Sequence, residues 1–536
     1  MSRTSHKASC LIKSKKGETK IFLLEDFHQI SSIKKARELT DSIYIRNDQI
    51  IQKYKYGEYP IYWAWYDLIY DQMIKYLEVK PLLEKIRSTD PREIYLNNFP
   101  AEYSKIFELY FFDVEILPKR KVERFNEIKK FIGNLFFALF SLLSILVIQI
   151  KRTSNNIGIR TEDLILKGTK SDFRLNNLYS KFDQNNVSYL EFVRIKSFTQ
   201  SFRNIFIRRR VAIYYTTISY FIKILNFQKN REITPENFHQ ALFETFRQET
   251  VILQKSIGLM AKILKLGHIK KFILISFSSR SAVLSFAAKE LDIKTIGIMH
   301  GLQQKEYAVY EFMESYNGPK IGCDYYSVWS NHYLDYFRNF SKVHVIDGIE
   351  NGGLLRPFKG YSKGDFKRVC TNKIKALLII EPLINQNEIA PYIKSLLIHP
   401  DIDLSIKLRP MIKDKAFESL KIILPETSDL KTYDGRISSI ANDFDVFIGS
   451  NSTAVIEAAI YNKISILVYT KKFADYFEIN HLIDGKKLLI EDPEEIYQKI
   501  IFRIKNENQL KTIPRTMHKF FGSLIDGNDW ILEKIK

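Results

Sequence analysis

The chain has 536 residues, of which 45% are hydrophobic and 26% charged; this composition excludes a disordered chain, a collagen-like fibre and a small disulfide-stapled module, and the length suits two or three domains. Its 81 Lys and Arg against 61 Asp and Glu leave a net charge of +20, which indicates an anionic partner (nucleic acid, a membrane surface or a phosphorylated substrate) or a gene rich in A and T. The three cysteines, Cys10, Cys323 and Cys370, are odd in number and far apart, which argues against a disulfide framework and a cysteine-based zinc site.

Short apolar runs alternate with helical patterns in the first 120 residues. The aromatic stretch 59–83 predicts a helix that packs Trp63 and Trp65 against a small sheet. A helix between the last two predicted strands indicates a parallel, right-handed crossover. The strands are predicted at residues 20–24, 93–96 and 113–117.

An uncharged apolar segment covers Phe131 to Ile150, with Lys residues before it and Lys-Arg after it. Its length and cationic ends are typical of a transmembrane helix. Two alternatives stay open: a monotopic helix that lies in one leaflet, and a helix buried in the protein. A single span would place residues 1–130 on the opposite side of the membrane from the rest of the chain. A second apolar stretch, 211–227, predicts an amphipathic core helix or a partner of the first segment.

Periodicity is poor from 152 to about 235 and then becomes clear. The pattern predicts helices and strands in alternation, and a Gly-rich linker at 350–363. The helices are predicted at 235–266 and 282–291, and the strands at 271–276, 294–299, 326–329 and 343–346.

A second alternation follows the linker. Repeated strand–helix–strand units in both halves predict an α/β protein with two Rossmann-like sheets facing across a cleft. The strands are predicted at 376–380, 403–408, 430–433, 446–449 and 464–469, and the helices at 390–397, 415–424, 437–442, 454–461 and 493–505.

The most informative segment is 443–469, in which a buried strand runs into a polar turn that opens a helix. Backbone N–H groups at a helix N-terminus, together with hydroxyl and amide side chains, bind anions. The turn could equally do no more than cap the helix. Glu457 lies one helical turn further on, where its carboxylate could accept hydrogen bonds from a ribose. The turn residues are Ser450, Asn451, Ser452 and Thr453.

This segment resembles the nucleotide-sugar site of GT-B glycosyltransferases, and more narrowly of enzymes of bacterial surface polysaccharides: capsule Kdo transferases, polysialyltransferases and CDP-glycerol glycerophosphotransferases. A second shared feature is a strand that ends in Lys-x-His-Pro, which here reads Lys407-Leu-Arg409-Pro. Arg stands where many members of the group have His, which puts a His-specific role in doubt, but Arg409 could bind a donor phosphate through two hydrogen bonds.

A third match lies in the first half, where a helix and a strand lead to His300-Gly301. The resemblance implies that His300 faces the cleft and acts as general base on the acceptor hydroxyl, and the pKa of imidazole suits that role. A lone histidine is more often structural. Gly301 and nearby polar residues are secondary candidates: Gln303, Glu306, Ser278 and Ser279.

No metal or cofactor is expected. Asp443-Phe-Asp445 matches the Asp-x-Asp metal motif of the other large glycosyltransferase fold, but it precedes the strand rather than following it, so a structural role is predicted. The sequence contains no GxxxxGK[ST], GxGxxG or HExxH motif. Helix N–H groups and cations would then neutralise the leaving phosphate.

Together these features predict a GT-B-like glycosyltransferase that moves a sugar, or a polyol phosphate, from a nucleotide-activated donor to a glycan or lipid-linked acceptor. We expect it at the cytoplasmic face of the inner membrane, with an anionic membrane surface and not nucleic acid as its partner. A non-catalytic nucleotide- or glycan-binding component of an envelope complex and a nucleotide-sugar epimerase are the alternatives. The predicted domains are 1–350, which contains the apolar helix 131–150, and 364–536, joined by 351–363.

Overall fold

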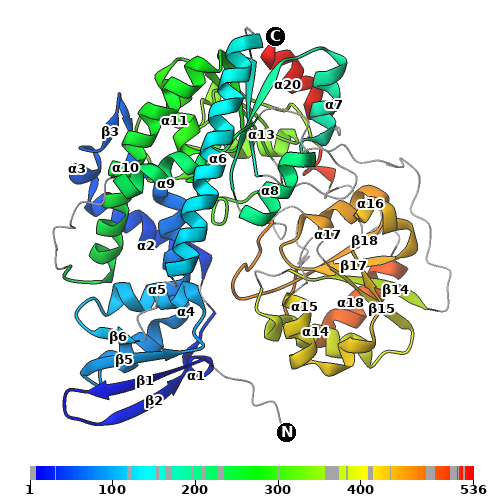
Figure 1. The fold of residues 1–536 in the computed structure, drawn as a ribbon. Coiled ribbons are helices and arrows are strands. Elements are labelled where there is room, and N and C mark those ends of the chain that lie inside the picture. Colours follow the sequence, from blue (N-terminus) through cyan, green and yellow to red (C-terminus); the bar gives the residue numbers. More distant parts are fainter. Residues whose placement is uncertain are drawn as a thin grey trace.

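Figure 1 shows the computed structural model, in which two α/β units lie side by side and a small third sheet lies below them. The residues that the structure describes are 8–30, 32–117, 124–151, 156–162, 172, 174–195, 197–207, 212–225, 235–299, 301–355, 373–381, 384–408, 415–434, 436–478, 489–506, 516, 518–522 and 525–536.

The region up to residue 117 contains a four-stranded sheet in the order β2-β1-β5-β6. The predicted parallel pairing is confirmed: β5 (Pro91–Asn97) and β6 (Glu115–Leu117) are parallel and are joined by α5 (Ala101–Tyr110). The strand β1 (Ser9–Ser14) was not predicted, and it pairs antiparallel with both β2 (Thr19–Leu23) and β5. The short elements of this region are α1 (Leu24–Phe27), α3 (Asp48–Ile51), β3 (Lys55–Tyr56) and β4 (Tyr59–Pro60).

The predicted packing of the two tryptophans on this sheet is wrong. Trp63 lies in a 3-10 turn, η1 (Ile61–Trp65), that leads into α4 (Tyr66–Arg87), and its ring centroid is 4.2 Å from that of Tyr44 on α2 (Ile33–Arg46). Trp65 donates its indole N–H to Thr250 Oγ1 over 2.8 Å. A half-buried indole needs an acceptor for its N–H, and the helix that carries Thr250 supplies it.

The first α/β unit contains a seven-stranded parallel sheet in the order β13-β12-β11-β10-β7-β8-β9. The chain builds β7, β8 and β9 in one direction and β10 to β13 in the other, so the strand order reverses between β7 and β10. The bounds are β7 (Asn156–Thr161), β8 (Tyr189–Val193), β9 (Ala212–Ile213), β10 (Ile269–Ile275), β11 (Lys294–Ile298), β12 (Tyr325–Ser327) and β13 (Ile349–Glu350).

Three of these strands lie in the region without clear periodicity, and their polar residues explain why they were missed. Every residue of β7 is buried, yet its sequence is NIGIRT rather than an apolar run. Asn156 donates to Gly267 O over 2.8 Å, and Arg160 pairs with Glu162. The buried polar groups are thus satisfied by partners that the local pattern cannot reveal.

The strand predicted at 343–346 is also wrong. His344 is fully buried, its Nδ1 accepts the N–H of Cys323 over 2.9 Å, and its Nε2 lies 2.6 Å from Glu311 Oε2. This side-chain anchor holds the segment beside the sheet, and the ladder is continued by β13 instead.

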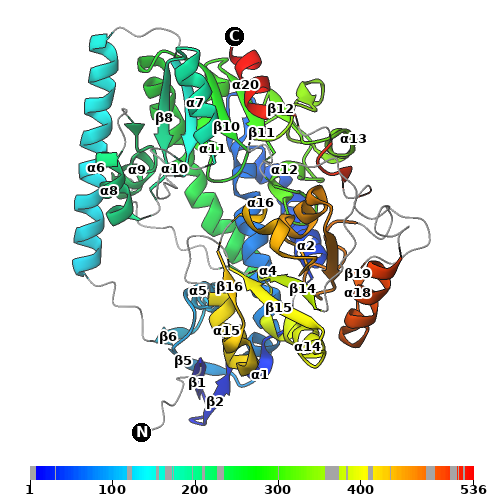
Figure 2. The ribbon, with the colours of Figure 1, turned by 90° about the vertical axis from the view of Figure 1, so that its right-hand side faces the viewer.

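Helices cover this sheet on both faces, and α6 (Arg124–Lys151) lies at the outside of the unit (Figure 2). The long helix α10 (Phe238–Leu266) matches its prediction closely and packs against α11 and α9. The remaining helices are α7 (Asn176–Gln184), α8 (Phe198–Ile207), α9 (Thr216–Leu225), α11 (Ala282–Glu290), α12 (Val309–Phe312) and α13 (Asn331–Phe340).

The second unit contains a six-stranded parallel sheet in the order β16-β15-β14-β17-β18-β19, which reverses between β14 and β17. The strands are β14 (Ile374–Ile379), β15 (Ile402–Lys407), β16 (Thr432–Tyr433), β17 (Val446–Gly449), β18 (Ile464–Val468) and β19 (Leu489–Ile490). Its helices are α14 (Gln386–Leu397), α15 (Lys415–Ile423), α16 (Ile437–Ile440), α17 (Thr453–Glu457) and α18 (Ile496–Lys505).

The predicted fold class is confirmed: the chain is an α/β protein with two parallel, doubly wound sheets and an apolar helix in the first half. The last helix, α20 (Gly527–Ile535), contacts β11, β12 and α7, so the chain returns to the first unit at its end. Leu354 forms a β-bridge with Asp526 beside it. Most of the predicted linker lies outside the described residues, and the domain boundaries stay a prediction.

Candidate functional site

The predicted polar turns lie where doubly wound sheets bind ligands, beyond the carboxyl ends of the strands next to the reversal of strand order. In the second sheet this reversal lies between β14 and β17, and Ser450–Thr453 directly follow β17. In the first sheet it lies between β7 and β10, and Ser278 and Ser279 follow β10.

α17 lies close against the end of β17, whose last residue is Gly449. A Cβ at Gly449 would lie 2.6 Å from Val455 Cγ2, so any side chain here would push α17 away from the strand. Ser450 and Ser452 are buried. Ser452 Oγ accepts the N–H of Ala454 over 3.3 Å, and the Ser450 hydroxyl donates to Asn451 Oδ1 over 3.1 Å. Ser452 therefore acts as the N-cap of α17.

The helix behind this turn is shorter than predicted. α17 has five residues and continues as a 3-10 turn, η5 (Ala458–Tyr461), which ends at Asn462 with a left-handed φ of 56°. So short a helix adds little dipole of its own. An anion at this turn would therefore be held mainly by the hydroxyl and backbone N–H groups of the turn rather than by the helix dipole. Glu457 is half-buried at the last residue of α17.

The structure brings the segment that follows β11 into contact with the Ser450–Thr453 turn. The backbone N–H of Leu302, in the segment after β11, donates to Thr453 Oγ1 at the start of α17 over 3.2 Å. A Cβ at Gly301 would lie 3.8 Å from the same oxygen. Two segments that are 151 residues apart in the chain thus meet at the junction of the two units. His300, the predicted base, lies outside the described residues.

Gln303 is the least satisfied polar side chain of this junction. It is 6% exposed, and neither its amide nitrogen nor its amide oxygen has a hydrogen-bond partner among the described residues. Leaving a buried amide without partners costs about 1–3 kcal/mol, so such groups are usually paired. Gln303 is therefore a candidate for contact with a ligand at this junction.

Next to it, a hydrogen-bonded seam joins the two units. Gln304 Nε2 and the hydroxyl of Tyr336 both donate to Glu478 Oε1, each over 3.2 Å. Glu306, a predicted secondary candidate, instead pairs with Arg37 over 3.3 Å, and burial raises the pKa of its carboxyl. Glu306 therefore has a structural partner, and Glu478 is a junction residue that its sequence context did not single out.

The turn after β10 is held by a carboxylate from α4. Ser279 donates its hydroxyl to Asp67 Oδ2 over 2.8 Å and its backbone N–H to Asp67 Oδ1 over 3.2 Å, and Ser278 N–H donates to Ser281 Oγ. Burial raises the pKa of Asp67 to about 6. Asp67 was not predicted, since it lies 212 residues earlier in the chain and no local motif connects it to this turn.

Lys407 ends β15 on the same edge of the second sheet as the Ser450–Thr453 turn. Its side chain is buried, and Nζ donates to Leu408 O over 3.2 Å. Its place at the carboxyl end of β15 puts a cationic side chain on the edge of the sheet where the predicted donor turn also lies. Arg409, two residues on, lies outside the described residues.

The Asp-x-Asp sequence occupies the opposite edge of the sheet, as predicted. Asp445 Oδ2 accepts the N–H of Lys375 over 3.0 Å, at the amino ends of β14 and β17. Among the residues that the structure describes, no three His, Cys, Asp or Glu side chains lie together as a metal site.

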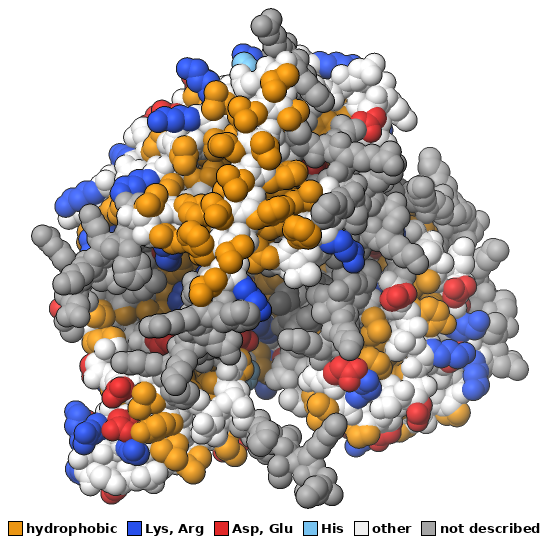
Figure 3. All heavy atoms as spheres, viewed as in Figure 1, with side chains coloured by type: hydrophobic (Ala, Val, Ile, Leu, Met, Phe, Trp, Pro, Cys, Tyr) orange, Lys and Arg blue, Asp and Glu red, His pale blue; other side chains and the backbone are white. Residues whose placement is uncertain are grey.

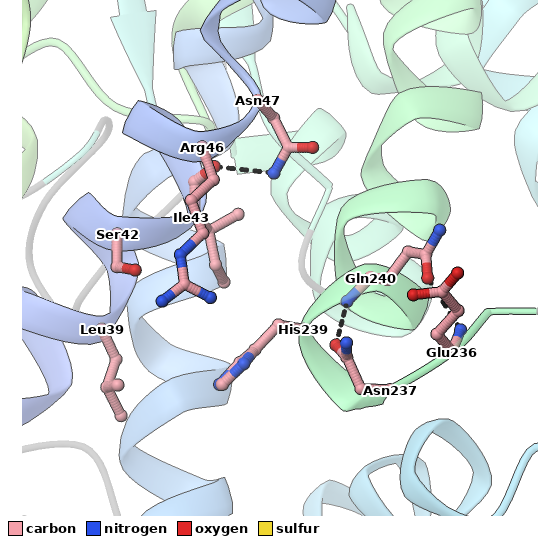
Figure 4. A pocket seen from close by; sticks show the side chains of 9 residues that line it. All are labelled: Leu39, Ser42, Ile43, Arg46, Asn47, Glu236, Asn237, His239 and Gln240. Carbon is pink, nitrogen blue, oxygen red and sulfur yellow. Dashed lines mark hydrogen bonds between the residues drawn. The ribbon is translucent and has the colours of Figure 1, made fainter.

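A cavity of about 260 Å³ lies elsewhere, between α2 and the start of α10 (Figure 4). Arg46 and His239 point into it from the two helices, and burial lowers the pKa of His239. It contains none of the predicted site residues. Its lining is Leu39, Ser42, Ile43, Arg46, Asn47, Glu236, Asn237, His239 and Gln240.

Comparison with known proteins finds distant structural similarity only. No protein-family model and no curated protein matches the chain. Solved structures that resemble it include UDP-GlcNAc 2-epimerase from Neisseria meningitidis bound to UDP-GlcNAc (TM-score 0.43, 10% identity, 72% of this chain and 99% of that one). MurG from Acinetobacter baumannii (0.43, 11%, 71% and 99%) and the glycotransferase of kitacinnamycin (0.41, 10%, 72% and 100%) are similar to the same extent. Likeness at this level identifies no family, so the site is judged on its own residues.

Proposed function

We propose that this chain is a glycosyltransferase that moves a sugar, or a polyol phosphate, from a nucleotide-activated donor to a surface polysaccharide acceptor at the cytoplasmic face of the membrane. The observation that carries the proposal is the contact between Leu302 N–H and Thr453 Oγ1. It joins a strand end of one parallel sheet to the strand end at the order reversal of the other. A ligand held by one turn is thereby presented to the other.

In this proposal the second unit binds the donor. Lys407, Arg409 and the Ser450–Thr453 turn hold the phosphate groups, and Glu457 accepts hydrogen bonds from the ribose. Cations and fixed N–H and O–H donors stabilise the negative charge that develops on the leaving phosphate, so no metal ion is required.

The first unit would supply the acceptor side. His300 removes the proton from the attacking hydroxyl, because a neutral imidazole near pH 7 is an effective general base. Gln303, whose amide has no partner among the described residues, is suited to hold a sugar hydroxyl next to it. The Tyr336–Glu478–Gln304 seam keeps the two units in register.

The experiment measures nucleotide release by the purified chain from CMP-, CDP- and UDP-linked donors, with and without a polysaccharide acceptor. We expect acceptor-dependent release from one donor class. Release without transfer, or conversion of the donor sugar with no acceptor present, would identify a hydrolase or an epimerase. Binding of a nucleotide with no turnover of any donor would favour a non-catalytic component.

A pair of serine variants tests the site itself. Ser452→Ala removes a hydroxyl from the proposed phosphate turn, and Ser32→Ala removes the matching N-cap of α2, where Ser32 Oγ accepts the N–H of Lys35 over 3.4 Å. Both variants lose one cap, so their stabilities should fall by a similar amount, about 1 kcal/mol. Only Ser452→Ala should also raise KM for the donor. Unchanged turnover in both Ser452→Ala and His300→Ala would refute the assignment.

A further inference from the structure

The apolar helix α6 has no role in the proposed transfer reaction. Its segment Ile128–Ile150 is long and apolar enough to cross a membrane, but only 28% of the most apolar window is buried in the protein. The face that stays outside must therefore be covered by something else or remain in water.

The inner face of α6 binds it to the protein along its length. Ser141 Oγ accepts the N–H of Tyr214 over 2.9 Å, and the ring of Phe137 lies 4.5 Å from that of Tyr214. A Cβ at Gly133 would meet the ring of Phe198 at 2.7 Å, so the helix approaches α8 closely there. The buried residues recur at helical spacing: Asn134, Phe137, Ser141, Ser144 and Ile148.

The outer face of α6 does not pack against the protein, and its exposed residues are large and apolar. Leu143 is 61% exposed and Ile150 is 79% exposed. In Figure 3 these side chains gather in one patch over α6. The outer face consists of Phe131, Ile132, Leu135, Phe136, Leu139, Leu142, Leu143, Leu146 and Ile150.

The same patch continues onto two neighbouring helices. Phe202 of α8 is 47% exposed, and its ring centroid lies 5.3 Å from that of Phe136. Ile224 and Leu225 at the end of α9 are exposed as well. Monomeric soluble proteins rarely expose a contiguous apolar surface of this extent.

A single transmembrane span is excluded by the core. Residues before and after α6 in the sequence pack directly together: Tyr62 OH donates to Phe243 O over 3.1 Å and Tyr70 OH donates to Glu306 O over 2.6 Å. A span would place these partners on opposite sides of the bilayer. The one-pass alternative of the sequence analysis is therefore wrong.

Charge identifies the surface that covers the patch. From Ile128 onward α6, α8 and α9 contain no Asp or Glu, and their charged residues are all cationic. Lys129 and Lys130 begin the apolar segment, Lys130 Nζ lies 5.6 Å from the ring centroid of Tyr220, and Arg203 is exposed on α8. Apolar side chains next to a cationic rim complement the interface of a bilayer with anionic phospholipids.

We propose that α6 lies in the plane of an anionic membrane, with its outer face and the adjoining residues of α8 and α9 inserted among the lipid headgroups, and with the rest of the protein on one side. The proposal concerns how the chain attaches to the membrane, and it does not depend on the chain being a transferase.

Co-sedimentation of the full chain with vesicles tests the proposed membrane attachment. We expect binding to vesicles of phosphatidylcholine with a quarter phosphatidylglycerol, weaker binding to phosphatidylcholine alone, and binding that survives a high-salt wash, because salt screens charges but does not remove an inserted apolar face. Leu139→Glu/Leu143→Glu should lower binding at least tenfold. Ile398→Glu/Ile422→Glu, which changes two exposed isoleucines of the second unit, should bind like the wild type.

The depth of fluorophores attached along α6 distinguishes a helix in the plane of the membrane from a helix that spans it. A fluorophore attached at Ile132→Cys, Leu139→Cys or Leu146→Cys should be quenched at the same shallow depth in all three variants. A deep central probe between two shallow ends would indicate a span and overturn the proposal. So would wild-type binding by the Leu139→Glu/Leu143→Glu variant, or a dimer that this variant dissociates while the wild type ignores vesicles.

Discussion

The junction of the two units and the outer face of α6 depart from the ordinary rule of burial in opposite ways. At the junction, polar groups are removed from water: Gln303, Ser450, Ser452 and Lys407 are all buried. On α6, large apolar side chains face outward while Asn134, Ser141 and Ser144 face the protein. Polar groups inside and apolar groups outside both lower stability unless a ligand or a surface compensates.

The difference between the two regions lies in how each is completed. In the proposed function the junction is completed by the phosphate groups of the donor. The face of α6 needs an extended apolar surface with anionic character at its edge. A single chain with both features is suited to join a phosphorylated donor to an acceptor held at a membrane.

The largest effect on donor turnover is expected from Lys407→Met. Removing the ammonium group while keeping the length of the side chain should lower turnover of the donor about 100- to 1,000-fold, as loss of a charge that stabilises a transition state does. The assay is release of free nucleotide. Lys375→Met is the matched control, because Lys375 is exposed at the amino end of the adjacent strand β14. An equal loss of turnover in both variants would show that the carboxyl edge of the second sheet is not specifically required.

The two faces of α6 can be compared by stability. Phe137→Ala, at 1% exposure, should cost about 3–4 kcal/mol, since it opens a cavity against Phe198 and Tyr214. Leu139→Ser, at 55% exposure, should change stability in detergent-free buffer by no more than about 0.5 kcal/mol. Urea unfolding followed by circular dichroism measures both. A large cost at Leu139 would mean that the outer face is packed after all.

Asp67 provides a test by pH at the first-sheet turn. Its pKa is raised from an ordinary 3.8 to about 6 in the folded chain, so the folded state holds the proton more strongly than the unfolded state. Stability should therefore fall as the pH rises from about 4 to 6, by about 3 kcal/mol, and stay reduced above 6. Asp67→Asn should flatten this slope. An unchanged pH profile in the variant would show that Asp67 is not the group responsible.

Gln303→Leu separates function from stability. Because the Gln303 amide is buried and unpaired among the described residues, replacing it with an apolar group of similar size should leave stability unchanged or raise it by about 1 kcal/mol. Donor-dependent turnover should fall about tenfold. Thermal melts with and without nucleotide record both effects. A clear loss of stability would assign the amide a structural partner.

The smallest expected effect is that of a chelator. Since the proposal neutralises the leaving phosphate with Lys407, Arg409 and hydroxyl groups, EDTA should leave the rate unchanged and added Mg²⁺ should not restore the Lys407→Met variant. A rate that falls in EDTA and recovers with one divalent cation would replace this part of the mechanism.

The sequence predicted the second sheet better than the first, for a physical reason. The strands β14, β17 and β18 are largely apolar and β15 alternates apolar with polar residues, so the local pattern is enough to predict them. In the first sheet β7 carries Asn156 and Arg160 inward, and only long-range partners make those positions tolerable. The Ser450–Thr453 turn could be found because it is contiguous, whereas Asp67 and Glu478 reach the site from distant elements that no local motif connects.

The return of α20 to the first sheet has a consequence for synthesis. During translation the second unit leaves the ribosome before residues 527–535 do, so the first unit receives its last covering helix only after the second is complete. Domains usually fold in the order of the chain. Here the half that begins first finishes last, and until then the face of β11 and β12 that α20 covers is open to chaperones or to incorrect partners.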